Sequence, residues 1–168
     1  ALYAAGAPGE VSVARFTGST LTNVSGPTIA VGGVANVTLN NSTASGSGEW
    51  LRVGTIADFP PLATRDAGLP GVTDPEGLET PIVFAPPAAL PVVPGLANVV
   101  LSRSTVIGSA FTAPGSVSNV SLLDDSRWIM TGSSNVTNLL NDPSLIQFTP
   151  PSGDPALLGS YKTLTTVN

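Results

Sequence analysis

The sequence of 168 residues contains no histidine, no cysteine and a single lysine. Without histidine and cysteine, it lacks both the Ser-His-Asp and the Cys-His arrangement for nucleophilic catalysis, and the commonest metal ligand. A zinc ion would have to be held by carboxylates alone, which is a rare arrangement. No GxSxG motif, P-loop or dinucleotide fingerprint is present either. We therefore expect no catalytic residues, no metal site and no cofactor, and a protein that is not an enzyme.

Charge is also scarce, at 10% of residues with a net charge of −5. The five arginines are scattered, so no basic stripe exists for nucleic acid or for anionic lipid. The absence of cysteine means that the fold is held by burial rather than by disulfides. No apolar stretch is long enough to span a membrane, and the residues from Ala1 on show no basic region followed by an apolar run, so we expect no signal peptide in them. We expect Ala1 to be an arbitrary start within a longer precursor, and residues 1–168 to form one domain.

Short apolar runs separated by turn residues indicate β-structure without helix. The clearest runs are Asn119–Leu123, Trp128–Met130 and Leu145–Phe148, and a weaker run begins at Tyr161. Runs of three to five residues at close and uneven spacing suit a chain that turns a corner every few residues, as a β-solenoid does. The polar stretch Ser42–Gly48 is expected to be a turn region. An antiparallel β-sandwich is the alternative fold.

A motif that begins Asn-Val-x-Leu recurs along the chain. Its copies start at Asn36, Asn98 and Asn119, with a truncated copy at Asn135. The step of 21 positions from Asn98 to Asn119 is about one solenoid coil. The step of 62 positions from Asn36 to Asn98 is close to three such coils. The step of 16 positions from Asn119 to Asn135 implies a short coil or a copy that is out of register. Chance recurrence of a common tetrapeptide is the competing explanation.

Period-2 alternation in each copy places the aliphatic side chains on one face and the asparagine on the other. The fold we predict is a parallel β-helix whose bore holds these aliphatic positions and the later apolar runs. The predicted bore residues are Val37, Leu39, Val99, Leu101, Val120, Leu122, Trp128, Met130, Ile146 and Phe148. The location of Trp50 is left open.

The segment Ile56–Leu96 departs from this pattern. It holds nine of the sixteen prolines and five of the eleven acidic residues. Proline removes a donor from a strand ladder, so the segment is unsuited to central strands. We predict that residues 56–96 form a long excursion outside the stacked coils, and loops of this length are usually functional or disordered.

Asp124-Asp125 is the one carboxylate pair that could carry acid–base chemistry on a polysaccharide. Adjacent strand residues point to opposite faces, so we favour an Asx turn at a corner. Asn-x-Ser/Thr triplets, which are glycosylation signals in a eukaryotic secreted protein, are more simply residues favoured at strand starts and corners. They begin at Asn23, Asn36, Asn40, Asn41, Asn119 and Asn135.

Four stretches follow one another in the last third of the chain: Arg127–Thr131, then Ser134-Asn135-Val136, then Leu145–Phe148, and finally Gly159–Thr165. They read as a Trp-x-Met strand, a Ser-Asn-Val corner, an apolar strand ending in Phe, and an aromatic-Lys-x-Leu-Thr strand. In order and spacing they resemble the end of a pertactin-like autotransporter passenger, and this resemblance implies a right-handed parallel β-helix. The family continues into glycine-rich final coils and an outer-membrane barrel, and this sequence stops at Asn168 before either.

This resemblance implies an extracellular protein displayed on the surface of a Gram-negative bacterium by type V secretion. Its role would be virulence-associated adhesion to a host cell-surface protein or glycan, with residues 56–96 as the candidate contact region. A structural scaffold that templates export is the main alternative, and a polysaccharide-acting β-helix enzyme is a weaker one. Uncapped strand edges would allow end-to-end self-association of the fragment.

Overall fold

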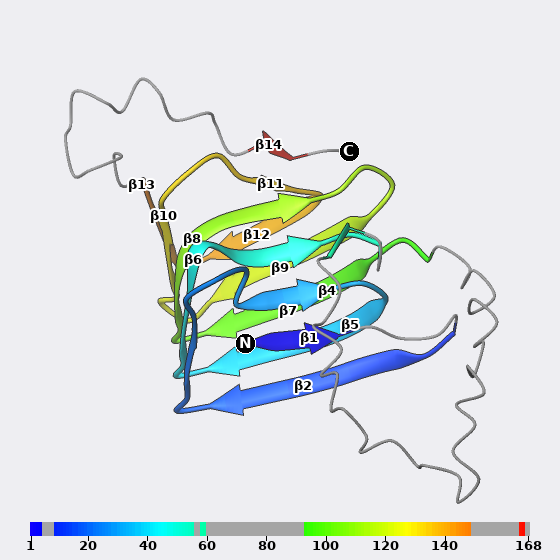
Figure 1. Cartoon of the computed structure of the whole chain (residues 1–168). Helices are drawn as coiled ribbons and strands as arrows, with labels where there is room; N and C mark the ends of the chain where they lie inside the picture. The colour runs from blue at the N-terminus through cyan, green and yellow to red at the C-terminus, as the bar shows by residue number, and fades with distance from the viewer. Residues whose placement is uncertain (5–8, 56–57, 60–92, 149–164, 167–168) are drawn as a thin grey trace, which may run out of the picture.

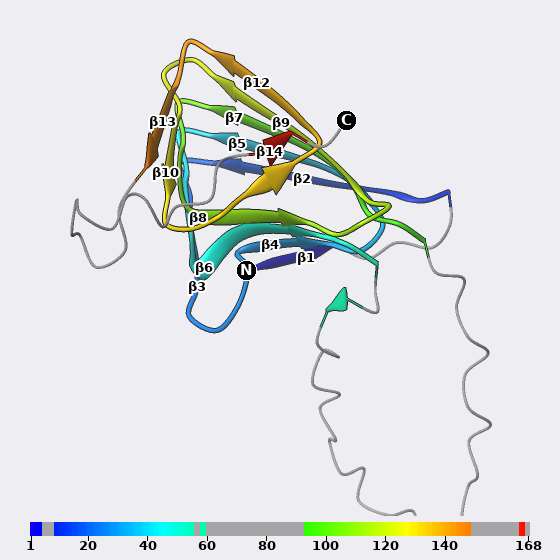
Figure 2. The same cartoon turned by 90° about the horizontal axis from the view of Figure 1, so that it is seen from above.

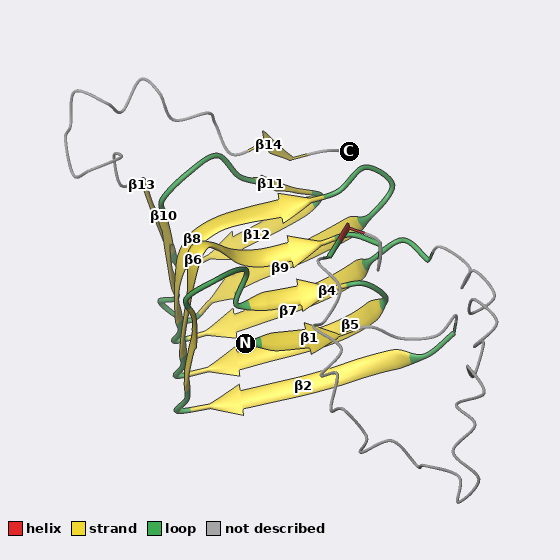
Figure 3. Ribbon diagram, in the orientation of Figure 1, coloured by secondary structure: helices red, strands yellow, loops and turns green. Residues whose placement is uncertain are grey.

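The computed structural model describes residues 1–4, 9–55, 58–59, 93–148 and 165–166, and it consists of strands with essentially no helix (Figure 3). Most strands follow the short runs expected from the sequence. The strands are β1 (Leu2–Ala4), β2 (Val11–Thr17), β3 (Thr20–Asn23), β4 (Ile29–Val31), β5 (Val34–Asn40), β6 (Thr43–Val53), β7 (Leu96–Ser102), β8 (Thr105–Thr112), β9 (Val117–Leu123), β10 (Arg127–Met130), β11 (Asn135–Val136), β12 (Asn138–Asp142), β13 (Leu145–Phe148) and β14 (Thr165–Thr166).

The strands form two large parallel sheets and a short parallel pair (Figure 1). One sheet has five strands in the order β12-β9-β7-β5-β2. The other has seven, in the order β1-β4-β6-β8-β10-β13, with β3 also paired to β6. Strands β11 and β14 pair separately. Every described pairing is parallel, which confirms the all-β prediction and excludes the antiparallel sandwich.

From β4 to β10 consecutive strands alternate between the two large sheets, so the chain repeatedly passes through one sheet and then the other. We call one such passage a circuit. Strand β6 pairs with β3 through its first residues and with β4 through its last, so the seven-stranded sheet bends around a corner. Seen from above, the strands outline a three-sided prism (Figure 2). This arrangement is consistent with a β-solenoid.

The register of the five-stranded sheet corrects the predicted coil spacing. Asn36 pairs directly with Asn98, so the step of 62 residues is one circuit and not three. Asn98 pairs with Asn119, as the 21-residue step predicts. The next residue in this row is Asn138 rather than Asn135, because β9 pairs with β12. Asn135 lies on β11, on another side of the prism.

The core lies between the sheets, and eight of the ten predicted bore residues are fully buried there. Ile146 is partly buried against them. The prediction for Phe148 is wrong, since its side chain is 45% exposed. Phe148 continues the row of Met130, but β13 is the last strand of its sheet in the described part of the chain, where it pairs with β10. Trp50, whose location the sequence left open, is buried beside Trp128.

The predicted turn at Ser42–Gly48 is also wrong, because residues 43–53 form the long strand β6. The polar stretch gains ladder partners on both sides, from β3 and from β8. A register shift between Ser45 and Glu49 absorbs the surplus glycine and serine residues. Gly46 is required in this bulge, since a Cβ there would overlap the Glu49 carbonyl group.

Two ladders of polar side chains run across the circuits. At one corner, each backbone N–H of a serine donates to the hydroxyl of the serine one circuit later, at 3.0–3.2 Å. On the outer face of the five-stranded sheet, asparagine side chains donate to one another at 2.7–2.8 Å. The serine ladder satisfies polar groups at the corner, as buried polar groups require. Its members are Ser19, Ser42, Ser104, Ser126 and Ser144; those of the asparagine ladder are Asn36, Asn98, Asn119 and Asn138.

Candidate functional site

The predicted excursion leaves and rejoins the stacked circuits at two adjacent glycines. Gly54 follows β6 and Gly95 precedes β7, and both are buried. A Cβ on Gly95 would lie 2.5 Å from the Gly54 carbonyl oxygen and 2.8 Å from that of Val31. Only glycine therefore allows the two chain ends to approach this closely.

The same corner one circuit earlier is closed by Gly32-Gly33 alone. The paired rows place Val53 beside Val31 and Leu96 beside Val34, so Gly54 and Gly95 are the counterparts of Gly32 and Gly33. Hydrogen bonds continue through both positions: the N–H of Gly54 donates to the Val31 carbonyl at 3.0 Å, and that of Leu96 to the Gly33 carbonyl at 2.8 Å. The chain between Gly54 and Gly95 is thus an insertion into a two-glycine corner.

These contacts correct the predicted bounds of the excursion, 56–96. Gly95 and Leu96 belong to the ladder, because Leu96 is the first residue of β7 and Gly95 accepts a hydrogen bond from Val117. At the other end, Phe59 is packed against the circuits and only 7% exposed. Residues 60–92 lie outside the described part of the chain.

A short turn brings Phe59 back to the seven-stranded sheet. The Asp58 carboxylate accepts from the Thr55 N–H at 2.6 Å and from its hydroxyl at 2.8 Å, and the Asp58 N–H donates to the Thr55 carbonyl. The backbone bond, followed by the hydroxyl bond, lowers the pKa of the Asp58 carboxyl group. The turn therefore favours the ionised carboxylate, and the Phe59 ring meets Tyr3 edge to face with centroids 5.4 Å apart.

The outer face of the seven-stranded sheet carries a row of side chains beside this ring pair. Tyr3, Ala30, Arg52 and Phe111 are neighbours in register on β1, β4, β6 and β8. The Arg52 guanidinium lies 5.0 Å from the Phe111 ring centroid. It also donates through Nε and Nη2 to the two Glu49 carboxylate oxygens, each at 2.7 Å. These hydrogen bonds are the main reason that the pKa of Arg52 is raised.

A surface hollow, which we call the aromatic cleft, lies over this row. Phe59 and Pro27 line both of its halves. Tyr3 and Ala30 line one half, of about 190 Å³, and Glu49 and Arg52 line the other, of about 370 Å³. The Asn23 side chain holds the β3–β4 loop against the cleft by donating to the Pro27 carbonyl at 2.8 Å.

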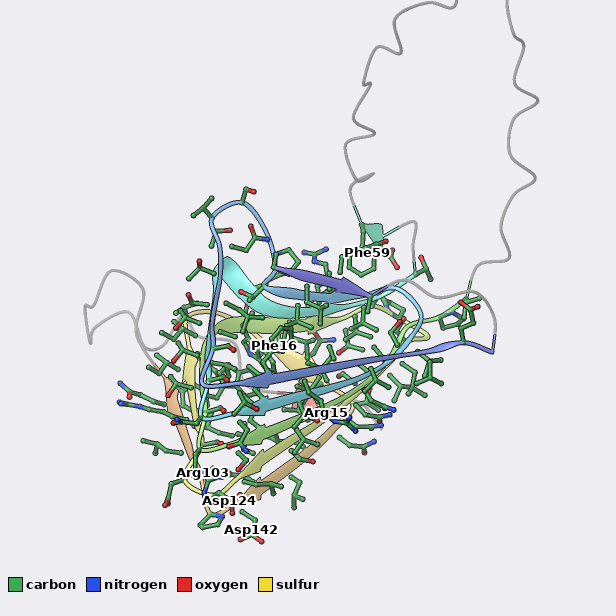
Figure 4. The ribbon with its side chains drawn as sticks, turned by 90° about the horizontal axis from the view of Figure 1, so that it is seen from below. Arg15, Phe16, Phe59, Arg103, Asp124 and Asp142 are labelled. Atoms are coloured by element: carbon green, nitrogen blue, oxygen red, sulfur yellow. The ribbon has the colours of Figure 1, made fainter. Side chains whose placement is uncertain are left out.

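The Asp124-Asp125 pair lies far from this cleft, at the corner shared with Arg103 and Asp142 (Figure 4). Both aspartates have left-handed backbone conformations, with φ of 53° and 60°, and both are exposed. The Asp124 carboxylate accepts from the Ser102 hydroxyl at 2.7 Å, in the preceding circuit, rather than from its own turn as we predicted.

Several of the predicted sequon asparagines have structural partners. Asn36 and Asn119 belong to the asparagine ladder. Asn135 exchanges hydrogen bonds with the backbone of Thr112, and Asn23 holds the β3–β4 loop. Asparagine at these positions therefore has a structural reason that is independent of glycosylation.

Sequence reasoning did not identify the aromatic cleft. Its members come from β1, β4, β6 and the turn at Asp58, so no local motif contains them. Its lining residues Tyr3, Ala30 and Arg52 become neighbours only through the pairing of β1, β4 and β6, which leaves no signal in the sequence. Among the residues that the structure describes, no group of three or more acidic, histidine or cysteine side chains is placed to hold a metal ion.

The described chain contains no helix that is long and apolar enough to cross a membrane. The candidate functional features described above are the insertion point between Gly54 and Gly95 and the aromatic cleft beside it. Comparisons with protein-family models, with curated proteins and with solved structures find no match for this chain.

Proposed function

We propose that the chain is a right-handed parallel β-helix and the passenger of a pertactin-like autotransporter, displayed on the surface of a Gram-negative bacterium. The in-register parallel stacking of successive circuits supports the solenoid. Right-handed crossover between parallel strands is the general rule and supplies the handedness. The absence of cysteine suits passage through an oxidising periplasm.

Within this proposal, the chain adheres to a host cell-surface protein or glycan through the inserted segment. The observation that supports this role is the close approach of Gly54 and Gly95, the two residues that flank the inserted segment. An insertion at such a corner leaves the ladders on both sides continuous, so a segment can be presented without loss of stacking. Binding residues are commonly carried by loops on a rigid scaffold.

The test is to delete residues 55–94 and join Gly54 directly to Gly95, which reproduces the Gly32-Gly33 corner. The variant and the parent chain would be displayed on bacteria from the same full-length precursor. We expect equal surface display by antibody labelling and a loss of binding to cultured host cells.

A replacement of residues 60–92 by a glycine-serine segment of equal length is the matched control, because it keeps the turn at Asp58 and the packing of Phe59. It should display normally and bind no better than the deletion. If the deletion displays and binds like the parent, adhesion through the insertion is wrong.

A folding scaffold for export is the second candidate. The observation in its favour is that the serine ladder continues through the last described circuits, to Ser126 and Ser144. Such circuits would form a stable end from which folding proceeds. Removal of Trp128–Phe148 would then abolish display, whereas deletion of residues 55–94 would leave both display and binding intact.

We further propose that the isolated chain associates through an end. Among the described strands, β2 is the edge of the five-stranded sheet, and Val11 and Val13 on its outer face are 53% and 58% exposed. An unpaired edge of this kind favours pairing with another strand. Sedimentation velocity should show oligomers that a lysine at position 13 reduces; a monomer at all concentrations would contradict this.

A further inference from the structure

The aromatic cleft has the features of a ligand site, and Phe59 is the one described lining residue that it takes from the inserted segment. Its walls are aromatic and aliphatic, from Phe59, Tyr3 and Pro27. Its polar groups are few and held in place by other contacts, chiefly the bidentate pair of Arg52 and Glu49. Small-molecule sites in proteins typically combine these two properties.

The charges in the cleft indicate a neutral ligand. The Arg52 guanidinium is already paired with Glu49 through two short hydrogen bonds, and both side chains are partly buried, at 32% and 24% exposure. An anionic ligand would have to compete with the Glu49 carboxylate, and a cationic ligand with the guanidinium. A neutral ligand with hydroxyl groups can instead accept from the guanidinium edge and donate to the carboxylate without breaking the pair.

The walls indicate a ligand with a flat apolar face. The Tyr3 and Phe59 rings stand edge to face, and Ala30 lies beside Tyr3 in the sheet row. The hydroxyl-bearing residues Ser25 and Ser47 lie on the exposed rim. A pyranose ring presents C–H groups on its faces and hydroxyl groups around its edge, which matches apolar walls under a polar rim.

We propose that the aromatic cleft binds a neutral saccharide of one or two sugar rings. The larger half of the cleft, about 370 Å³, is of the size that small ligands occupy, and the smaller half adds about 190 Å³ beside it. Phe59 and Tyr3 contact the ring face, and the Arg52–Glu49 pair orients the hydroxyl groups. The glycine-serine replacement of residues 60–92 keeps Phe59 and therefore the cleft, so that variant lets each proposal fail without the other.

The experiment is saturation-transfer NMR and calorimetric titration of the full chain with four neutral disaccharides: maltose, cellobiose, lactose and diacetylchitobiose. We expect at least one to bind with a dissociation constant of about 10 mM or lower. Arg52→Gln and Phe59→Ala should each weaken that binding by about tenfold or more, which corresponds to roughly 1.4 kcal/mol.

Two matched variants serve as controls. Arg15→Gln removes an exposed arginine on the five-stranded sheet, and Phe148→Ala removes an exposed phenylalanine at the far end of the seven-stranded sheet. Neither should change the affinity. Since Phe59→Ala can also loosen the turn at Asp58, the Arg52→Gln result decides if the two disagree.

Three results would overturn the proposal. One is that none of the four disaccharides binds at about 10 mM. Another is that binding persists unchanged in Arg52→Gln. The third is that sialyllactose, which is anionic, or a proline-rich peptide competes for the cleft more strongly than any neutral disaccharide.

Discussion

At the residue scale, Trp50 and Trp128 form an edge-to-face pair in the core, with ring centroids 5.6 Å apart. Both are fully buried, but their indole N–H groups differ. Trp128 Nε1 donates to the Gly108 carbonyl at 2.9 Å. Trp50 Nε1 has no hydrogen-bond partner among the described residues.

We therefore predict that Trp128→Phe lowers the free energy of unfolding by about 1–3 kcal/mol more than Trp50→Phe does. Both changes leave a similar void, whereas only the first leaves the Gly108 carbonyl without its donor. Urea denaturation followed by circular dichroism measures the difference. Equal losses in the two variants would contradict the assigned hydrogen bonding.

Gly95 gives a second prediction at this scale. A methyl group there would press on the backbone carbonyls of Gly54 and Val31, and backbone atoms cannot move aside cheaply. Gly95→Ala should lower the free energy of unfolding by about 1–3 kcal/mol, as overpacking does. Gly48→Ala is the control, because nothing lies within 4 Å of its Cβ position; its effect should stay within about 0.5 kcal/mol.

At the scale of elements, the serine ladder joins each corner to the next. Ser104 both accepts from the Ser42 N–H and donates from its own N–H to Ser126, at 3.1 and 3.2 Å. Ser104→Ala removes the acceptor and leaves the buried Ser42 N–H unpaired. The expected loss is about 1–3 kcal/mol of unfolding free energy.

Ser121→Ala is the control for this ladder, because Ser121 lies on the outer face of β9. It should change stability by less than about 0.5 kcal/mol. Thermal unfolding of the two variants side by side makes the comparison. A ladder variant as stable as the control would mean that water replaces the serine hydroxyl without loss.

Strands with strict alternation could be predicted from the sequence, and those that depend on their partners could not. In β5, β7 and β9 the valine and leucine of the Asn-Val-x-Leu motif lie two positions apart and the asparagine lies on the other face, so the buried face was assigned correctly. In β6 the segment Thr43–Gly48 is polar and rich in glycine and serine, and it becomes a strand only because β3 and β8 flank it. The aromatic cleft could not be predicted from the sequence either, because its residues come together only when the circuits stack.

At the scale of the whole molecule, the sequence indicated a long proline-rich segment, but the number of circuits between Asn36 and Asn98 was predicted wrongly. The 62-residue step was divided into three coils because a regular period was assumed. The register shows one circuit with an insertion, and the two glycines that mark it are 41 positions apart in sequence. Local patterns carry no information about two chain positions that meet only in the folded state.

The insertion also separates the chain into two parts for folding. In the unfolded chain, pairing β7 with β9 closes a loop of about 21 residues, whereas pairing β5 with β7 closes one of 62. The longer loop costs about 1 kcal/mol more in chain entropy, or about fivefold in closure rate. Residues 9–54 and 95–148 should thus condense first as separate blocks and dock later. Stopped-flow refolding should show a docking phase about fivefold faster once residues 55–94 are deleted; an unchanged phase would mean that the blocks do not form independently.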